Sequence, residues 1–364
     1  MKIAFYGSSL LSSYWNGAAT YYRGMLGELA RHGHEITFYE PDAFDRQKHR
    51  DIEPPSYAEV KVYPATVEAC RAVIAEAAAA DVVVKASGVG VFDDMLLEGI
   101  VAASRPDAIR IFWDVDAPAT LAELRAHPDH PMHRAMPALD LVLTYGGGPP
   151  VIEAYEGLGA RRCIPVYNAL DPATHHPVPP DERFTADLSF LGNRLPDREA
   201  RVEEFFLEPA KALPSRHFLI GGNGWESKAM PANVSHLGHV YTRDHNAFNC
   251  TPLAVLNIAR DSMASTGYSP ATRVFEAAGA AACLITDAWV GLDGFLAEGS
   301  EVLVARDGRD VAEIMAGLDR DRARAIGEAA RRRVMAEHTY ARRGVQVDAI
   351  LKEEAARKAL RSVA

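Results

Sequence analysis

The sequence has 364 residues, of which 48% are hydrophobic and 24% charged, and this length is sufficient for two domains with separate cores. The formal net charge of −10 would repel a polyanion, so nucleic acid is not expected as a partner. The four cysteines are widely spaced without a CxxC pair, which disfavours a disulfide framework or a zinc site and favours a reducing cytoplasm. No apolar run is long enough for a membrane span.

Short β-branched and aromatic runs alternate with segments of helical period along the whole chain. This alternation is typical of βαβ units around a parallel sheet. In the first half, the predicted strands cover residues 2–7, 35–40, 81–87, 109–116, 140–146 and 163–169. Tyr21, Tyr22, Met25 and Leu26 recur at helical spacing. They predict a core-facing helix that begins near Ala18, after a loop.

Residues 170–184 contain several prolines and little periodicity, which indicates a linker. After it, the predicted strands cover residues 186–192, 216–222, 236–240, 253–259, 282–287 and 301–305. We therefore predict an α/β protein with two Rossmann-like doubly wound domains. The expected parts are an N-terminal domain at 1–170, a linker at 171–185, a C-terminal domain at 186–338, and a helix at 339–364 that crosses back to the first domain.

Ligands of open α/β sheets bind beyond the carboxyl ends of the strands, so the turns after the strands are candidate sites. A glycine in such a turn lets backbone amides approach a phosphate, and an arginine can pair with it. A tight turn that needs only the glycine is the alternative interpretation. The residues in these positions of the second domain are Gly192, Asn193, Arg194, Gly221, Gly222, Asn223 and Arg260.

The strongest local signal is the sequence GYSPATRVFEAAG. Ser269 is suited to cap a helix, and Pro270 is suited to its first position. Free amides at a helix start bind anions, and Thr272 and Arg273 would add a hydroxyl and a charge there. Glu276 shares their face and could accept hydrogen bonds from two ribose hydroxyls. A core helix in which Glu276 pairs with Arg273 is the alternative.

Five segments carry a family resemblance: SPATRVFEAAGAAACLITD, SFLGNRLPDR, WNGAATYYRGMLGELARHGHEITFYEP, FWDVDAP and HTYARRG. They resemble the GT-B glycosyltransferases, in particular the group that includes the spore-maturation protein CgeB. The resemblance implies a nucleotide-sugar donor (a UDP-, GDP- or dTDP-sugar) in the C-terminal domain and an acceptor in the N-terminal domain. It also implies transfer in the cleft between them, with no metal and no prosthetic group.

Carried over residue by residue, the resemblance assigns the donor ribose to Glu276 and the base to the backbone of His239 and Val240. The diphosphate is assigned to Ser269, Thr272, Arg273 and the turn of Gly192, Asn193 and Arg194. Many retaining members carry a second glutamate eight positions before the ribose glutamate, where this chain has Tyr268. The stereochemistry of transfer therefore does not carry over.

An inverting transfer needs a general base, and Asp114 and Asp116 stand at the carboxyl end of a predicted strand of the first domain. Asp116, directly before Ala117 and Pro118, is the preferred base. Helix capping or turn formation is the alternative role for this residue. The pair also has the spacing of a metal-binding Asp pair, but we expect no metal site.

The loop after the first strand acquires a role from the same resemblance. Asn16, Gly17 and Ala18 would form a small helix start that lets the donor diphosphate or the acceptor approach. Trp15 would serve as a platform for the acceptor.

Two other functions remain open. A nucleotide-sugar 2-epimerase of the same fold would convert the donor without an acceptor, whereas a transferase would at most hydrolyse it slowly. A sugar-nucleotide-binding protein without turnover is the other possibility, and Tyr268 in place of a glutamate is the feature that favours it. The sugar, the base, the acceptor and the oligomeric state are not specified by the sequence.

Overall fold

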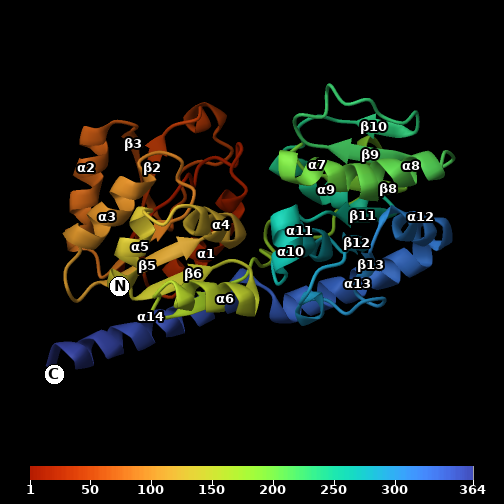
Figure 1. Cartoon of the computed structure of the whole chain (residues 1–364). Coiled ribbons are helices and arrows are strands. Elements are labelled where there is room, and N and C mark those ends of the chain that lie inside the picture. The colour runs from red at the N-terminus through yellow and green to blue at the C-terminus, as the bar shows by residue number, and fades with distance from the viewer. Residues whose placement is uncertain (364) are drawn as a thin grey trace. The chain divides into compact units, whose positions relative to one another are not determined.

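The computed structural model describes residues 1–363, with side chains described up to residue 361. The chain forms two compact units (Figure 1). The first unit runs from Met1 to Tyr167 and includes the C-terminal segment from Tyr340 onward, and the second runs from Asn168 to Thr339. Residues 171–185, for which the sequence predicted a linker, are part of the second unit.

The first unit contains a seven-stranded parallel sheet with the order β3-β2-β1-β4-β5-β6-β7. The strands are β1 (Lys2–Tyr6), β2 (Glu35–Asp42), β3 (Glu59–Pro64), β4 (Val82–Ala86), β5 (Ile109–Asp114), β6 (Leu141–Thr144) and β7 (Cys163–Pro165). The chain reverses its direction of strand addition between β1 and β4, which pair side by side. The loops after these two strands therefore lie at the switch point where such sheets bind ligands.

Helices cover both faces of this sheet (Figure 1). They are α1 (Ala18–Arg31), η1 (Arg46–His49), α2 (Val67–Ala75), η2 (Glu76–Ala79), α3 (Asp93–Ala103), α4 (Ala117–Ala126), α5 (Pro131–Ala135), η3 (Met136–Ala138), α6 (Gly148–Gly157) and α14 (Tyr340–Val363). The strands β1 and β4 are almost fully buried, so their mostly apolar sequences reflect burial on both faces, and the buried Lys85 of β4 pairs with Asp93.

The C-terminal helix α14 packs on α1 within the first unit. Gly24 of α1 lies under the Tyr340 ring so closely that a Cβ atom at position 24 would be 2.3 Å from it. Farther along α14, Asp348 Oδ1 lies 3.1 Å from Nε2 of His34, just before β2, and Lys358 Nζ lies 2.6 Å from Oδ2 of Asp140, just before β6. A small residue and buried polar pairs therefore hold the tail in place.

The second unit contains a six-stranded parallel sheet with the order β10-β9-β8-β11-β12-β13. Its strands are β8 (Leu188–Leu191), β9 (Phe218–Gly221), β10 (Val234–His236), β11 (Ala254–Asn257), β12 (Leu284–Asp287) and β13 (Leu303–Ala305). The switch point lies between β8 and β11, which pair with each other. The turns after these strands are therefore the expected ligand positions.

The helices of the second unit pack around this sheet and its apolar core, which includes Phe190, Phe206, Phe218 and Trp225. They are η4 (Glu182–Phe184), α7 (Pro196–Val202), the π-helical turn η5 (Glu203–Leu207), α8 (Glu208–Ala212), η6 (Thr242–Asp244), α9 (His245–Cys250), α10 (Asp261–Thr266), α11 (Thr272–Gly279), η7 (Leu292–Gly294), α12 (Gly308–Gly317) and α13 (Arg320–Glu337).

The predicted α/β class with two doubly wound units is confirmed, whereas one predicted strand is misplaced and one strand was not predicted. The strand predicted at 236–240 lies earlier, at β10, because Gly238 adopts a positive φ of 69° and turns the chain out of the sheet. The strand β3 at the sheet edge was not predicted, since charged residues interrupt its apolar pattern.

None of the helices in the described part of the chain combines the length and apolar character that crossing a bilayer requires.

Candidate functional site

The helix α11 begins beyond the carboxyl ends of the strands of the second sheet. Ser269 was predicted to cap this helix, but it does not. Ala271 is the flanking residue, with extended backbone (φ −65°, ψ 154°), and the helix begins at Thr272. Ser269 is buried, and its hydroxyl donates to the Gly267 carbonyl at 2.9 Å. This local hydrogen bond replaces the capping interaction. Thr272 and Arg273 occupy the first turn, as predicted.

Glu276 is buried in the second turn of α11, with 6% of its surface exposed. Arg273 Nη1 lies 3.2 Å from Glu276 Oε2, and His175 Nε2 lies 3.8 Å from Glu276 Oε1. Burial alone would raise the pKa of Glu276, but the charge of Arg273, with smaller contributions from His175 and His245, outweighs burial and lowers the pKa to about 2. Glu276 is therefore a buried carboxylate that stays ionised at neutral pH.

Sequence reasoning missed the two histidines beside Glu276. His175 belongs to the proline-rich segment that was taken for a linker, and His245 begins α9. One possible ligand atom from each histidine and from Glu276 lies within 4.8 Å of the others. No spacing signal could have found this group, because its members come from three separate segments of the chain.

The two glycine-rich turns after β8 and β9 pack against each other. Gly222 has a φ of 121°, and a Cβ atom there would lie 2.3 Å from the Gly192 carbonyl oxygen. Asn193 Oδ1 accepts a hydrogen bond from the backbone amide of Asn223 at 2.9 Å, and Gly192 N donates to Gly221 O at 3.0 Å. The glycines are thus required for close backbone approach between the turns, which was the alternative interpretation of the pattern.

Two of the arginines predicted at the phosphate site are held in ion pairs. Arg194 makes a bidentate pair with Glu199, at 2.9 and 2.7 Å, and also donates to Ser227 Oγ at 3.1 Å. Arg260 Nε donates to Asp197 Oδ2 at 2.5 Å. These pairs fix the two side chains in place.

A third arginine, Arg198, was not identified from the sequence. It belongs to the first turns of α7, and its Nη1 would be 2.6 Å from a Cβ atom at Gly192. Burial lowers the pKa of Arg198, and Arg260 and Arg273 lower it further, while Asp197 opposes them. Its Nε is buried and has no hydrogen-bond partner among the described residues. Arg198 thus brings a buried guanidinium, with its Nε unpaired among the described residues, to the turn after β8.

The carboxylate of Asp287 organises the chain just before Arg260. Asp287 is fully buried at the end of β12, and its two oxygens lie 3.1 and 3.2 Å from the backbone amide of Ala259. Arg201 Nη2 donates to it at 2.6 Å. The end of β11 is therefore rigidly connected to the neighbouring strand.

His239 and Val240, which the resemblance assigns to the base, follow β10. His239 is exposed, and its ring meets Tyr241 edge to face at 4.6 Å. Val240 is buried against Phe248, and its carbonyl lies 3.3 Å from His245 Nε2. This segment therefore runs from the exposed His239 to Val240, whose carbonyl contacts His245, one of the two histidines beside Glu276.

In the first unit, the two candidate bases differ in environment. Asp114 is fully buried at the end of β5, where it accepts hydrogen bonds from Tyr155 Oη, from Asp116 N at 2.9 Å and from Thr120 Oγ1 at 3.1 Å. Burial raises the pKa of Asp114. Asp116 is half-buried at the start of α4. Asp114 thus positions the turn, and of the two residues only Asp116 is partly exposed.

Of the candidate residues in the loop before α1, Asn16 is buried, and Trp15 and Gly17 are exposed. Asn16 is buried, and its amide donates to Ser9 O and Ser12 O at 2.9 and 3.0 Å, so it holds the loop together. Trp15 is 51% exposed with a φ of 48°, and Gly17 is exposed directly before Ala18. A left-handed tryptophan backbone is uncommon and marks the loop as a strained segment.

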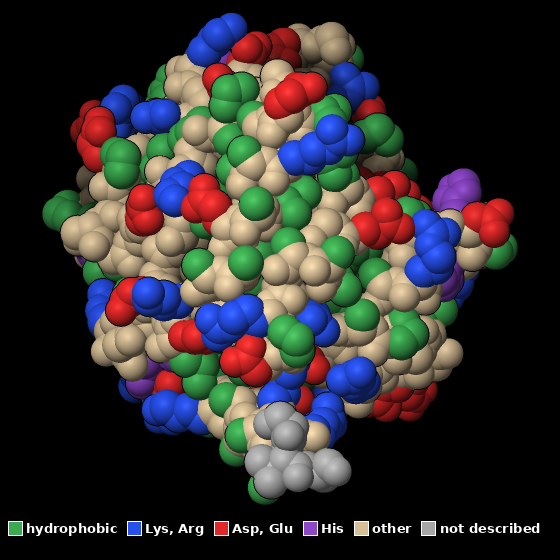
Figure 2. Space-filling view, turned by 90° about the vertical axis from the view of Figure 1, so that its left-hand side faces the viewer, with side chains coloured by type: hydrophobic (Ala, Val, Ile, Leu, Met, Phe, Trp, Pro, Cys, Tyr) green, Lys and Arg blue, Asp and Glu red, His purple; other side chains and the backbone are tan. Residues whose placement is uncertain are grey.

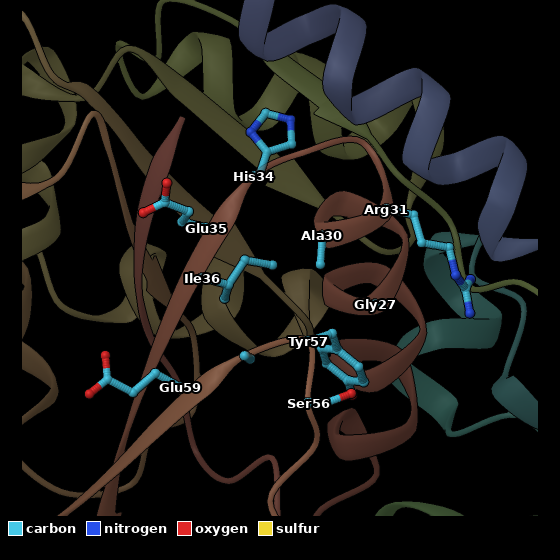
Figure 3. Close-up of a pocket in the computed structure, with 10 residues that line it drawn as sticks. Gly27, Ala30, Arg31, His34, Glu35, Ile36, Ser56, Tyr57 and Glu59 are labelled. Carbon is cyan, nitrogen blue, oxygen red and sulfur yellow. The ribbon is translucent and has the colours of Figure 1, made fainter.

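A cavity of about 840 Å³ lies elsewhere in the first unit. Figure 3 shows it beside α1, with Tyr57 and Ser56 on one side and Ile36 and Glu59 on the strands. None of the predicted site residues lines it. On the face drawn in Figure 2, basic and acidic side chains are interspersed, which gives no support for a polyanion partner there.

Residues 198–351 match the protein family described as "Glycosyl transferase-like". HepE of Anabaena, solved with UDP and glucose, is 14% identical with a TM-score of 0.69, over 97% of this chain and 100% of that one. Sucrose-phosphate synthase of Thermosynechococcus elongatus is 13% identical with a TM-score of 0.69, over 97% and 98% of the two chains.

An α-glucosyltransferase solved with UDP and DNA is 10% identical with a TM-score of 0.71, over 97% and 99% of the two chains. A search of curated proteins finds none that matches this chain. The chain therefore has the GT-B glycosyltransferase fold, as predicted, and most of its second unit is similar to a glycosyl transferase-like family. The narrower CgeB-like group is not shown by these comparisons.

Proposed function

We propose that the protein is a glycosyltransferase of the hexosyltransferase type that uses a nucleoside diphosphate sugar. The observation that carries the proposal is Glu276, a buried carboxylate held ionised chiefly by Arg273, in the segment that matches the glycosyl transferase-like family. An ionised carboxylate without direct access to bulk water is suited to accept hydrogen bonds from two ribose hydroxyls. UDP is the first candidate nucleotide, since HepE and the α-glucosyltransferase were solved with it.

The diphosphate would lie between the start of α11 and Arg198. The amides of the first turn of α11 and the Arg198 guanidinium, whose Nε has no partner among the described residues, would supply positive potential there. These groups would stabilise the charge that develops on the diphosphate as the bond to the sugar breaks. Such a site needs no metal ion at the diphosphate. Arg194 and Arg260 would support it through their ion pairs.

The acceptor would bind to the first unit, with Asp116 as general base. Asp116 would take the proton from the acceptor hydroxyl while that oxygen forms its bond to the anomeric carbon and the nucleoside diphosphate leaves. Asp114 is a positioning residue, because its carboxylate accepts a hydrogen bond from the backbone amide of Asp116. Trp15 is proposed as the platform for the acceptor, and Gly17 and Ala18 as the small start of α1 beside it.

The four free thiols, Cys70, Cys163, Cys250 and Cys283, suit a reducing cytoplasm, which we propose as the location. The acceptor is proposed to be a hydroxyl compound other than nucleic acid, because the net charge of −10 would oppose binding of a polyanion.

The proposal is tested by incubating the protein with UDP-, GDP- and dTDP-hexoses, with and without a panel of simple sugar acceptors. We expect slow release of UDP from UDP-hexose, faster release with an acceptor, and no loss of rate in EDTA. Formation of the 2-epimer without an acceptor would replace the transferase by an epimerase. Tight nucleotide binding with no release under any condition would indicate a binding protein.

A further inference from the structure

We propose that His175, His245 and Glu276 form a binding site for one zinc-like transition-metal ion. One possible ligand atom from each residue lies within 4.8 Å of the other two, and His175 Nε2 lies 3.8 Å from Glu276 Oε1. Ligands of a tetrahedral zinc ion, at about 2.1 Å from the metal, stand roughly 3.4 Å apart. Small side-chain rotations would therefore close the site.

The hydrogen bonds of His245 leave a lone pair on its buried nitrogen. Its Nε2 lies 3.3 Å from the Val240 carbonyl, which can only accept, so Nε2 carries the proton. Nδ1 then has the lone pair, and it is buried without a hydrogen-bond partner among the described residues. A ring nitrogen that donates to a backbone carbonyl while the other remains open is the arrangement of metal-ligating histidines.

His175 has the same property with the two nitrogens exchanged. The Thr174 hydroxyl donates to Asp171 O at 3.2 Å, so it accepts from His175 Nδ1 at 3.0 Å. Nε2 therefore carries the lone pair. His175 is 4% exposed, and Nε2 has no hydrogen-bond partner within the described part of the chain. Two histidine nitrogens with free lone pairs therefore lie beside the Glu276 carboxylate, and a single bound cation would satisfy all three groups.

The ligand set defines the class of ion. Two imidazoles and one carboxylate suit Zn²⁺, and also Co²⁺, Ni²⁺ or Cu²⁺, whereas Mg²⁺ prefers oxygen ligands. Arg273 contacts the other oxygen of the carboxylate, Oε2, at 3.2 Å, so Oε1 remains on the side of His175. Three protein ligands leave one position for water.

The site has a regulatory consequence that rests on the proposed function. Glu276 cannot hold a metal ion and two ribose hydroxyls at the same time. Bound Zn²⁺ would therefore exclude the nucleotide, and the nucleotide would exclude Zn²⁺. Metal binding itself does not depend on the protein being a glycosyltransferase.

The test of the metal site uses Co²⁺ as a visible probe with the full chain after treatment with a chelator. We expect one Co²⁺ per chain with the intense visible absorption of a four-coordinate site, and at least about tenfold weaker binding in His175→Gln and in His245→Gln. His217→Gln is the matched control, since both His217 ring nitrogens have partners at 2.9 Å. Binding that the first two variants leave unchanged would overturn the proposal.

A second measurement separates the metal site from the proposed function. UDP affinity is measured by calorimetry at a free Zn²⁺ concentration fixed by a chelator buffer. We expect Zn²⁺ to weaken UDP binding to the native chain and to leave UDP binding to His175→Gln unchanged. UDP binding without any Co²⁺ signal would refute the metal site alone. A Co²⁺ signal that depends on the histidines, without UDP binding, would refute the proposed function alone.

Discussion

Arg273 Nη1 lies 3.2 Å from Glu276 Oε2, one turn away on α11, so the buried carboxylate keeps its charge. In the proposed donor site, two ribose hydroxyls would donate hydrogen bonds to the oxygens of Glu276. We predict that Glu276→Ala weakens UDP binding by about 100-fold, because two charge-assisted hydrogen bonds contribute about 3 kcal/mol. Calorimetry measures the affinity.

Glu298→Ala is the control for this variant, because that side chain is 62% exposed and only 3.9 Å from its ion-pair partner Arg306. The control should bind UDP as the native chain does. An unchanged affinity of the Glu276→Ala variant, with the circular dichroism spectrum intact, would show that the ribose lies elsewhere.

Arg198 allows a prediction that distinguishes binding of the diphosphate from binding of the nucleoside. Arg198→Gln removes a cation whose Nε has no partner among the described residues, so the folded chain loses no hydrogen bond at that nitrogen. We predict a loss of about 10- to 100-fold in UDP affinity, the value of a charge-assisted contact to phosphate, with unchanged affinity for uridine. Arg309→Gln, at a side chain 89% exposed, is the control. Equal losses for UDP and uridine would remove Arg198 from the phosphate site.

Asp114 and Asp116 should respond differently to loss of charge. We predict that Asp116→Asn retains UDP affinity within a factor of about two and loses at least about 100-fold in turnover, as expected for a general base. Asp114→Asn instead disturbs three hydrogen bonds in a fully buried position, and we expect about 1 to 3 kcal/mol of destabilisation. Initial rates and thermal unfolding measure the two effects. Full activity of Asp116→Asn, with exposed Asp129→Asn as its control, would exclude Asp116 as the base.

The strands of the two sheets were largely predictable, because strands buried on both faces need continuous apolar sequences bounded by turn residues. The strand β4 (VVVKA) is entirely buried and was predicted from its three consecutive valines, whereas edge strand β3 (EVKVYP) alternates charged and apolar residues and was missed. Ser269 was misplaced because its hydroxyl had a nearer partner, the Gly267 carbonyl. Local pattern thus predicts elements well and capping interactions less reliably.

The candidate site was only partly predictable. Glu276, Thr272 and Arg273 share one helix, so their relation follows from helical spacing. Arg198 comes near Gly192 only through the path of the turn between β8 and α7. His175 approaches Glu276 from a segment without periodicity, and no short-range signal in the sequence reports such a long-range contact.

The contact between His34 and Asp348 gives the docking of α14 a pH dependence. Burial lowers the pKa of His34, although Asp348 opposes this, and Lys352 and His34 hold the pKa of Asp348 below its usual value. A depressed His34 pKa means that its contribution to stability is present above the unfolded pKa of about 6.5 and is lost as the pH falls through the lower folded value. Asp348 stays ionised throughout this range.

We therefore predict that the melting temperature of the native chain falls more between pH 7 and pH 5 than that of His34→Gln. Glutamine can still donate to Asp348 but does not titrate in this range. His127→Gln, in an exposed turn, should behave as the native chain does. Parallel pH profiles of the native chain and His34→Gln would show that His34 does not titrate with unfolding.

The close approach of α1 and α14 gives a prediction about Gly24. An added Cβ atom would lie 2.3 Å from the Tyr340 ring, and the ring is buried, so either the ring or the helix must shift. We predict that Gly24→Ala destabilises the first unit by about 1 to 3 kcal/mol, the usual range for overpacking, although alanine is the better helix former. Hydrogen exchange of α14 should quicken in the same variant, because the tail loses part of its packing.

Gly157→Ala is the matched control at the end of α6, where an added Cβ atom meets nothing within 4 Å. This control should be neutral or slightly stabilising. If both variants melted at the native temperature with unchanged exchange, Tyr340 would not be the contact that holds α14 on α1.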